Sequence, residues 1–299
     1  MKQEIRGVVP ILVAPFGRSG NVDLDSLGRL VEFNLRSGVH GLGVALGSEI
    51  FRLTESERDL VTSSVVDQVR KRVPIVINTG APGTDVAVFY SRRAQDLGAD
   101  AVMVSPPIGP GGPVGADGVL QYFRCISDAV DIPVMIQDVG TAPVPPSLVK
   151  EIVNQNPNAR YCKMETPPTP KRIADTVSAC KGTVGVMGGA GGNYFVEELR
   201  RGSTGTMPSC STPRAFVKVW DLFQAGNVEE ATRVFYEQIL PVNRLASQGI
   251  DHFYHVHKKI LERFGVIDCA YVRGPTSELD EATRRELDAL VESLAVSAP

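Results

Sequence analysis

Lys163 stands in the middle of the short apolar run RYCKM, residues 160–164, and Glu165 follows one residue after that run. A lysine is almost never fully buried unless it is paired or takes part in chemistry. Burial favours the neutral amine, and a neutral amine can attack a ketone to form a Schiff base. The pattern therefore predicts a Schiff-base lysine at position 163, with a purely structural ion pair between Lys163 and Glu165 as the alternative.

The alternation of a strand indicates where these two side chains point. Cys162 and Met164 fall on one face, and Lys163 and Glu165 fall on the other. The sulfur-containing side chains suit a face that is covered by helices. In a barrel, Lys163 and Glu165 would then point inward near the C-terminal ends of the strands, where barrel active sites lie.

Eight apolar, β-branched runs recur in the first two-thirds of the chain, with helix-like segments between them. Each run is continuous rather than alternating, which is typical of parallel strands buried on both faces. The runs are residues 7–16, 41–46, 74–79, 100–105, 132–138, 160–164, 182–187 and 203–208. This number of strands and helices predicts an α/β fold, a (β/α)8 TIM barrel, over residues 1–208. A doubly wound open sheet is the rival fold, although no G-x-G-x-x-G follows the first run.

From about residue 209 the strand pattern gives way to helical segments. FVKVWDLFQAG, NVEEATRVFYEQILPVNRL, HVHKKILERFG and DEATRRELDALVESLAV all have helical character. We therefore expect residues 209–299 to form a C-terminal helical extension packed on the barrel.

Polar residues stand at the ends of other predicted strands. The second run ends in ALGSE, which offers Gly47, Ser48 and Glu49, and the fifth ends in IQD, which offers Gln137 and Asp138. Because active sites of barrels lie at this edge, we expect these side chains and the Gly47 backbone to bind substrate. Glu49 has an alternative role, which is to cap the helix that begins near Thr54.

Composition excludes several classes of protein. The chain has 299 residues and a formal net charge of −3, so it has no electrostatic footprint for nucleic acid. No apolar run approaches 18 residues, which argues against a membrane helix. The five cysteines are odd in number and lack C-x-x-C spacing, which argues against a disulfide framework and fits a cytoplasmic protein.

A histidine cluster, HFYHVH, places His252, His255 and His257 close together in a predicted helix. No carboxylate spacing completes a set of metal ligands. We therefore expect no metal and no cofactor, and a polar helix face or a subunit contact is the expected role of these histidines.

Several segments together resemble the dihydrodipicolinate synthase / N-acetylneuraminate lyase family. They are GVVPILVAPFGRSGNVDLDSLGRLVEFNLRSGVHGL, SEIFRLTESER, RAQDLGADAVMVSPP and the strand that carries Lys163. The resemblance covers nearly the whole chain. It implies a Schiff-base lyase on a (β/α)8 barrel with Lys163 as the reactive lysine, a small 2-oxo acid as substrate, and a homodimer or homotetramer.

Departures from the synthase pattern point to one branch of this family. The chain has ALGSE where synthases have GTTGE or GSTGE, and Gln137 stands where they have a tyrosine. Together with KMETP on the sixth strand and GTMP after the eighth, these features resemble the 2-keto-3-deoxy-L-arabonate dehydratase branch. The resemblance implies dehydration of that acid to 2,5-dioxopentanoate, and it places Met207 of GTMP among the substrate-binding residues. From strand parity and position, we expect Glu165 to be the proton shuttle.

Two other functions remain open from the sequence. A pyruvate-dependent class I aldolase or synthase would use the same Schiff base, although the missing tyrosine counts against it. A barrel that binds a 2-oxo acid without turnover would have no need of the amine of Lys163.

Overall fold

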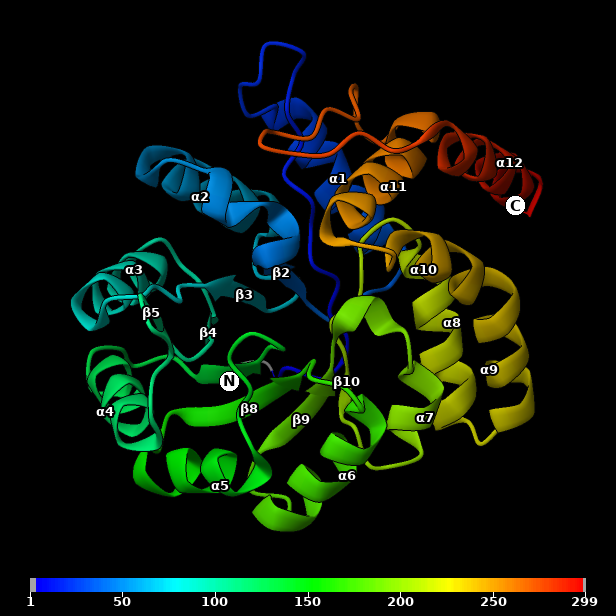
Figure 1. Cartoon of the computed structure of the whole chain (residues 1–299). Coiled ribbons are helices and arrows are strands. Elements are labelled where there is room, and N and C mark those ends of the chain that lie inside the picture. Colours follow the sequence, from blue (N-terminus) through cyan, green and yellow to red (C-terminus); the bar gives the residue numbers. More distant parts are fainter. Residues whose placement is uncertain (1–3, 298–299) are drawn as a thin grey trace. The chain divides into compact units, whose positions relative to one another are not determined.

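The computed structural model describes residues 4–297, and it contains an eight-stranded parallel sheet whose strands alternate with helices along the chain (Figure 1). The hydrogen-bonded order is β1-β10-β9-β8-β7-β4-β3-β2. The strands are β1 Gly7–Val8, β2 Leu42–Val44, β3 Ile75–Asn78, β4 Ala101–Val104, β7 Val134–Asp138, β8 Ala159–Met164, β9 Gly185–Gly188 and β10 Gly205–Thr206. This confirms the predicted (β/α)8 barrel with C-terminal helices.

Each predicted run overlaps one of these strands, and most of the strands are shorter than the runs; β8 and β9 each extend one residue beyond theirs. The first run contributes only Gly7–Val8, because Pro10 has no N–H to continue a ladder. A small antiparallel pair, β5 Ile108–Gly109 and β6 Gly112–Pro113, was not predicted, since its glycines and prolines carry no strand pattern.

The chain folds into two compact units. The first comprises the N-terminal residues through Val9, His40–Gly43 and Lys71–Pro208, and the second comprises Pro10–Val39, Val44–Arg70 and the chain from Ser209 onward. How the predicted C-terminal extension packs on the barrel stays a prediction.

In the first unit, helices lie outside the strands and bury their outer face (Figure 1). They are α3 Thr84–Asp96, α4 Ala116–Ser127, α5 Pro146–Gln155, α6 Thr169–Cys180 and α7 Phe195–Leu199. Both faces of these strands are therefore covered, which explains why their sequences are continuously apolar.

The second unit is helical. Its helices are α1 Leu24–Arg36, α2 Glu55–Val69, α8 Pro213–Gln224, α9 Val228–Val234, α10 Leu240–Ala246, α11 Ile250–Arg263 and α12 Glu281–Ser297, with a π-helical turn at Phe235–Ile239. Helix α2 begins with a capping box in which Thr54 and Glu57 bond each other's backbone N–H. Apolar residues of α10, α11 and α12, among them Val242, Ile260 and Leu287, form a common core.

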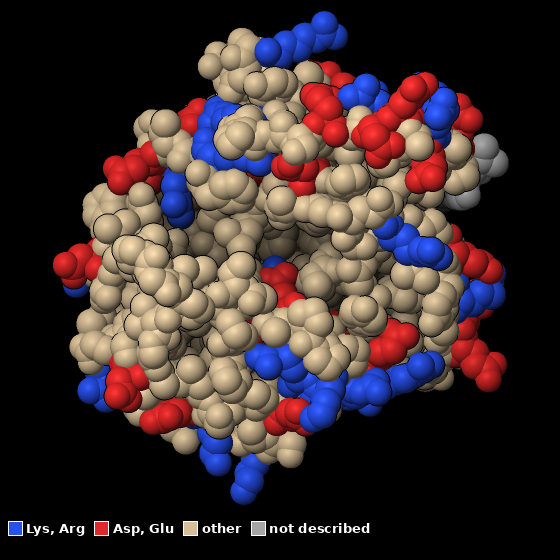
Figure 2. All heavy atoms as spheres, viewed as in Figure 1, with Lys and Arg blue, Asp and Glu red and all other residues tan. Residues whose placement is uncertain are grey.

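The surface carries charges of both signs. Figure 2 shows basic and acidic side chains interspersed over much of the visible face. No helix within residues 4–297 has the length and apolar content needed to cross a membrane.

Gly205 provides a test of how β1 pairs with β10. Its φ is +153°, and a Cβ there would lie 2.0 Å from the carbonyl oxygen of Gly7. Because two backbones cannot yield as a flexible side chain can, we expect Gly205→Ala to lower the free energy of unfolding by about 3 kcal/mol, the upper end of the usual cost of overpacking. Gly111→Ala, where a Cβ would meet nothing within 4 Å, should change it by less than about 0.5 kcal/mol. Urea unfolding of both variants measures this, and equal effects would contradict the backbone clash.

Candidate active site

Lys163 and Glu165 leave the end of β8 on the same face, as the alternation predicts. Nζ of Lys163 lies 3.2 Å from Oε1 of Glu165, and the two side chains are 5% and 18% exposed. Gly189, directly after β9, approaches both closely. A Cβ there would lie 2.6 Å from Cε of Lys163 and 2.5 Å from Cγ of Glu165. A side chain at position 189 would therefore displace the pair.

Glu165 accepts hydrogen bonds from two further groups. Nε2 of Gln137 donates to Oε2 at 2.7 Å, and the backbone N–H of Ala190 donates to Oε1 at 2.8 Å. Gln137 pairs directly with Lys163 across β7 and β8, so its side chain reaches the same face. Because both carboxylate oxygens have donors, the orientation of Glu165 is fixed.

Asn78, at the end of β3, also belongs to this cluster, although no pattern in the sequence singles it out. Its Nδ2 donates to Oε1 of Gln137 at 2.8 Å, and the side chain is buried. The available signal was its position as the last residue of a strand, which it shares with many residues that have no such contact.

Asp138 is fully buried and holds the turn that follows Glu165. Its oxygens accept from the backbone N–H of Thr166 at 3.0 Å, from Oγ1 of Thr166 at 2.9 Å and from the backbone N–H of Val144 at 2.7 Å. Arg172 adds a charged contact of 2.8 Å. Both carboxylate oxygens of Asp138 thus already accept hydrogen bonds from residues of the first unit. The predicted contact of Asp138 with substrate stays a prediction.

Met207 follows β10 and is buried. Its backbone N–H donates to the carbonyl oxygen of Gly188 at 3.0 Å, which places it beside the end of β9. Its part in substrate binding also stays a prediction.

Glu198 is a buried carboxyl group that sequence reasoning missed. Oγ1 of Thr169 donates to its Oε1 at 2.6 Å, while its buried Oε2 has no hydrogen-bond partner. A Cβ on Gly188 would lie 1.8 Å from that Oε2, so the acid packs against bare backbone. Burial raises the pKa of Glu198 to about 7, and the nearby acids Glu197 and Glu165 add to the rise.

Gly47 and Ser48 lie in the second unit, in a 3₁₀ turn at Leu46–Ser48. Oγ of Ser48 donates to the carbonyl oxygen of Leu12 and accepts from the backbone N–H of Ala45 at 3.0 Å. The hydroxyl group of Ser48 therefore already donates its proton to a backbone carbonyl group. The predicted contacts of Gly47 and Ser48 with substrate stay predictions.

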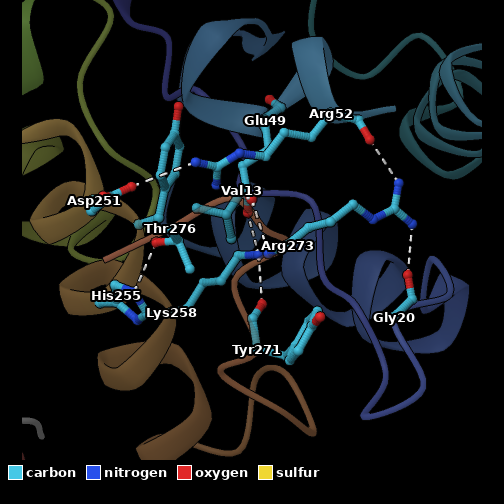
Figure 3. A network of polar contacts seen from close by, with 12 residues as sticks. Val13, Gly20, Glu49, Arg52, Asp251, His255, Lys258, Tyr271, Arg273 and Thr276 are labelled. Carbon is cyan, nitrogen blue, oxygen red and sulfur yellow. Dashed lines mark hydrogen bonds and ion pairs between the residues drawn. The ribbon is translucent and has the colours of Figure 1, made fainter. Parts of the chain in front are cut away.

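Glu49 is fully buried and adopts a left-handed backbone with φ of 55°. Figure 3 shows it together with Arg52, Lys258 and Arg273. Lys258 of α11 contacts its Oε1. Its Oε2 accepts from Nη1 of Arg52 at 2.8 Å and from the backbone N–H of Arg273 at 3.2 Å. The alternative role as a helix cap is wrong, because Thr54 and Glu57 cap α2.

Two of the cationic residues that contact Glu49, Lys258 and Arg273, pack on the ring of Phe16. Nζ of Lys258 lies 4.4 Å from the centre of the Phe16 ring, and the guanidinium of Arg273 lies 4.3 Å from it. Burial lowers the pKa of Lys258 to about 8, against the opposing effect of Glu49. Lys258 therefore stays charged at neutral pH and balances the buried carboxylate.

The three histidines of α11 do not form a cluster of ligands. His257 is buried and shares a hydrogen bond of 2.8 Å with Oγ of Ser211, and His255 bonds Oγ1 of Thr276 at 3.1 Å. Burial lowers the pKa of His257 to about 3, so its ring is neutral. Within residues 4–297, no three His, Cys, Asp or Glu side chains are grouped as metal ligands would be.

The raised pKa of Glu198 predicts a specific pH dependence of stability. The folded protein keeps the proton up to about pH 7, whereas an unfolded glutamate loses it near 4.5. The stability that this proton provides is complete below pH 4.5 and is lost as the pH rises to about 7, a loss of about 3 kcal/mol. Between pH 5 and pH 8, the parent should therefore lose stability relative to Glu198→Gln in urea unfolding. Glu151→Gln, at an exposed site on α5, should follow the parent, and parallel curves for all three proteins would refute the assignment.

Comparison with known proteins agrees with this architecture. The sequence model of the Dihydrodipicolinate synthetase family matches residues 4–294. The L-2-keto-3-deoxyarabonate dehydratase of Azospirillum brasilense is 30% identical over 97% of this chain and 94% of its own. The 4-hydroxy-tetrahydrodipicolinate synthase of Xanthomonas campestris pv. campestris is 32% identical over 76% of each chain.

Among solved structures, the dihydrodipicolinate synthase of Rhodopseudomonas palustris is similar to this chain with a TM-score of 0.89. The two share 25% sequence identity, and the match covers 98% of each chain. Sequence and fold thus agree over nearly the whole length, which confirms the resemblance noted from the sequence: the chain belongs to the dihydrodipicolinate synthetase family.

Proposed function

We propose that this protein is a hydro-lyase that forms a Schiff base with a 2-keto-3-deoxy sugar acid and removes water from it. The observation that carries the proposal is the pair formed by Lys163 and Glu165, with Nζ and Oε1 3.2 Å apart on one face of β8. A lysine supplies the imine, and the adjacent carboxylate supplies an acid/base group where a tyrosine is missing.

The proposed substrate is 2-keto-3-deoxy-L-arabonate, and the product is 2,5-dioxopentanoate. The similarity to the Azospirillum brasilense enzyme named for that acid supports this choice, since it extends over 97% of the chain. The proposed substrate-binding residues are Gly47, Ser48, Glu49, Gln137, Asp138 and Met207.

The chemistry follows from the two side chains. Glu165 accepts the ammonium proton of Lys163, and the neutral amine adds to the C2 ketone to give a carbinolamine. Glu165 returns this proton to the carbinolamine hydroxyl group, which leaves as water, so that an iminium ion and the carboxylate of Glu165 remain. The iminium ion acidifies the C3 protons, so Glu165 can take one of them and leave an enamine. The enamine expels the C4 hydroxyl group, which leaves as water with the proton from Glu165. Tautomerisation and hydrolysis of the imine then release the 2,5-dioxo acid and restore the amine.

An aldolase or synthase that uses pyruvate is the second candidate. The similarity to the Xanthomonas campestris synthase, 32% identical over 76% of the chain, favours it. Against it, the position of the synthase tyrosine holds Gln137, whose amide donates to Glu165. A panel of 2-keto-3-deoxy acids, assayed for water loss and for pyruvate release in one reaction, separates the two candidates. A non-catalytic 2-oxo-acid binder would give neither product.

Borohydride trapping tests the Schiff base directly. With pyruvate and borohydride, the parent chain should gain the mass of one reduced adduct, because reduction makes the imine of Lys163 permanent. Lys163→Ala should abolish the adduct, whereas Lys171→Ala, at an exposed lysine paired with Asp175, should keep it. Intact-protein mass spectrometry reads the result. An adduct that survives Lys163→Ala ends the Schiff-base proposal.

Glu165→Gln tests whether the carboxylate carries protons or only pairs with the lysine. The amide keeps the size of the side chain but cannot take a proton, so trapping should persist while water loss falls by at least about 100-fold. Glu151→Gln serves again as the exposed control and should keep full activity. Turnover of Glu165→Gln within about threefold of the parent would assign Glu165 a structural role.

A further inference from the structure

Three side chains from β3, β7 and β8 form a continuous line of hydrogen bonds within the first unit. Nδ2 of Asn78 donates to Oε1 of Gln137 at 2.8 Å, and Nε2 of Gln137 donates to Oε2 of Glu165 at 2.7 Å. Strand β4 separates β3 from β7 in the sheet, so Asn78 and Gln137 meet by reaching across it on the same face. Asn78 and Gln137 are 3% and 1% exposed, which leaves their amides little access to water.

A backbone N–H determines the orientation of the side-chain amides in this line. The N–H of Gly80 lies 3.2 Å from Oδ1 of Asn78, and because a backbone N–H can only donate, that atom must be oxygen. The amino group of Asn78 therefore faces Gln137. Gln137 must therefore accept this hydrogen bond with its own oxygen. Its amino group then faces Glu165.

We infer that Asn78 is a positioning residue for the reaction, because it makes Gln137 present a hydrogen-bond donor to Glu165. The inference rests on the proposed role of Glu165 as the proton carrier. Nothing in the backbone of β7 chooses between the two orientations of the Gln137 amide, since rotation of the amide exchanges its oxygen and nitrogen in almost the same volume. The donor on Asn78 favours the orientation that also lets Gln137 donate to Glu165, and it stabilises that orientation from the other end of the amide.

Reversal of the Gln137 amide would place its oxygen against Oε2 of Glu165, so that two acceptors would face each other in a site with little water. The carboxylate would lose a charge-assisted hydrogen bond. A hydrogen bond to a charged group corresponds to a change of about 10- to 100-fold in a rate that depends on it. Imine formation at Lys163 does not require this bond and should continue.

Two substitutions of Asn78 separate this role from simple packing. Asn78→Asp keeps the size of the side chain but offers only acceptors, so Gln137 can donate to Glu165 only by placing its own oxygen against an acceptor at position 78. Asn78→Ala removes the donor and leaves Gln137 free to take either orientation. Water loss should therefore fall by about 10- to 100-fold in Asn78→Asp and by less in Asn78→Ala. A packing role predicts the opposite order, because alanine leaves a cavity and aspartate does not.

Pyruvate trapping at Lys163, measured on the same samples, should stay within about threefold of the parent. The matched control is Thr79→Val, which removes the neighbouring buried hydrogen bond of 2.8 Å between Thr79 and Ser91. It should leave both readouts near those of the parent. Loss of water elimination in this control would show that any polar deletion near the end of β3 has the same effect, and would overturn the inference.

If Asn78→Asp fails to trap pyruvate, a second pair of variants gives the answer. Gln137→Leu removes the amide, and Asn78→Ala added to it should then change water loss by less than about threefold, because Asn78 acts through Gln137. A further loss of tenfold or more overturns the inference. So does an Asn78→Asp variant as active as the parent, or one more active than Asn78→Ala. A parent that traps pyruvate but dehydrates no acid in the panel defeats the proposed function itself, and the inference with it.

Discussion

The carboxylate of Glu165 lies beside Lys163 in a site where little water reaches it, and a charge in such a place must be given hydrogen-bond donors. Three segments of the first unit supply them: β8 gives the ammonium, β7 gives the amide of Gln137, and the turn after β9 gives the N–H of Ala190. The last contact is possible only because Gly189 has no side chain to fill the space. The order of strands in the barrel is thus what brings donors from distant parts of the sequence to one acid.

Much of this could be predicted from the chain alone, because it depends on local patterns. Continuous apolar runs mark strands covered on both faces, and a period of two places Lys163 and Glu165 together. Asn78 and Glu198 could not be found in this way. Their roles depend on which strands and helices become neighbours, and the contacts of Glu198 with Gly188 and Thr169 join segments that no short-range pattern connects.

The two buried lysines also show what a local sequence pattern can and cannot reveal. Lys163 interrupts an apolar strand and is conspicuous, whereas Lys258 follows His257 in the polar-looking stretch HVHKKILER and reads as part of a solvated helix face. In the structure Lys258 is the more buried, with no exposed side-chain surface, and its charge balances Glu49. In each unit, the buried lysine is therefore paired with a glutamate. Only Lys163 combines a partner with a side chain that keeps some exposure, as a reacting group needs.

Glu49 has a consequence for how this chain can evolve. Its left-handed backbone would suit glycine better than any side chain. Glycine, however, would leave Lys258 as a buried charge without its counterion. The two positions are therefore not independent, because loss of either partner leaves the other as a buried charge with one counterion fewer. We therefore expect positions 49 and 258, which are 209 residues apart in the sequence, to vary together among descendants of this protein or not to vary at all.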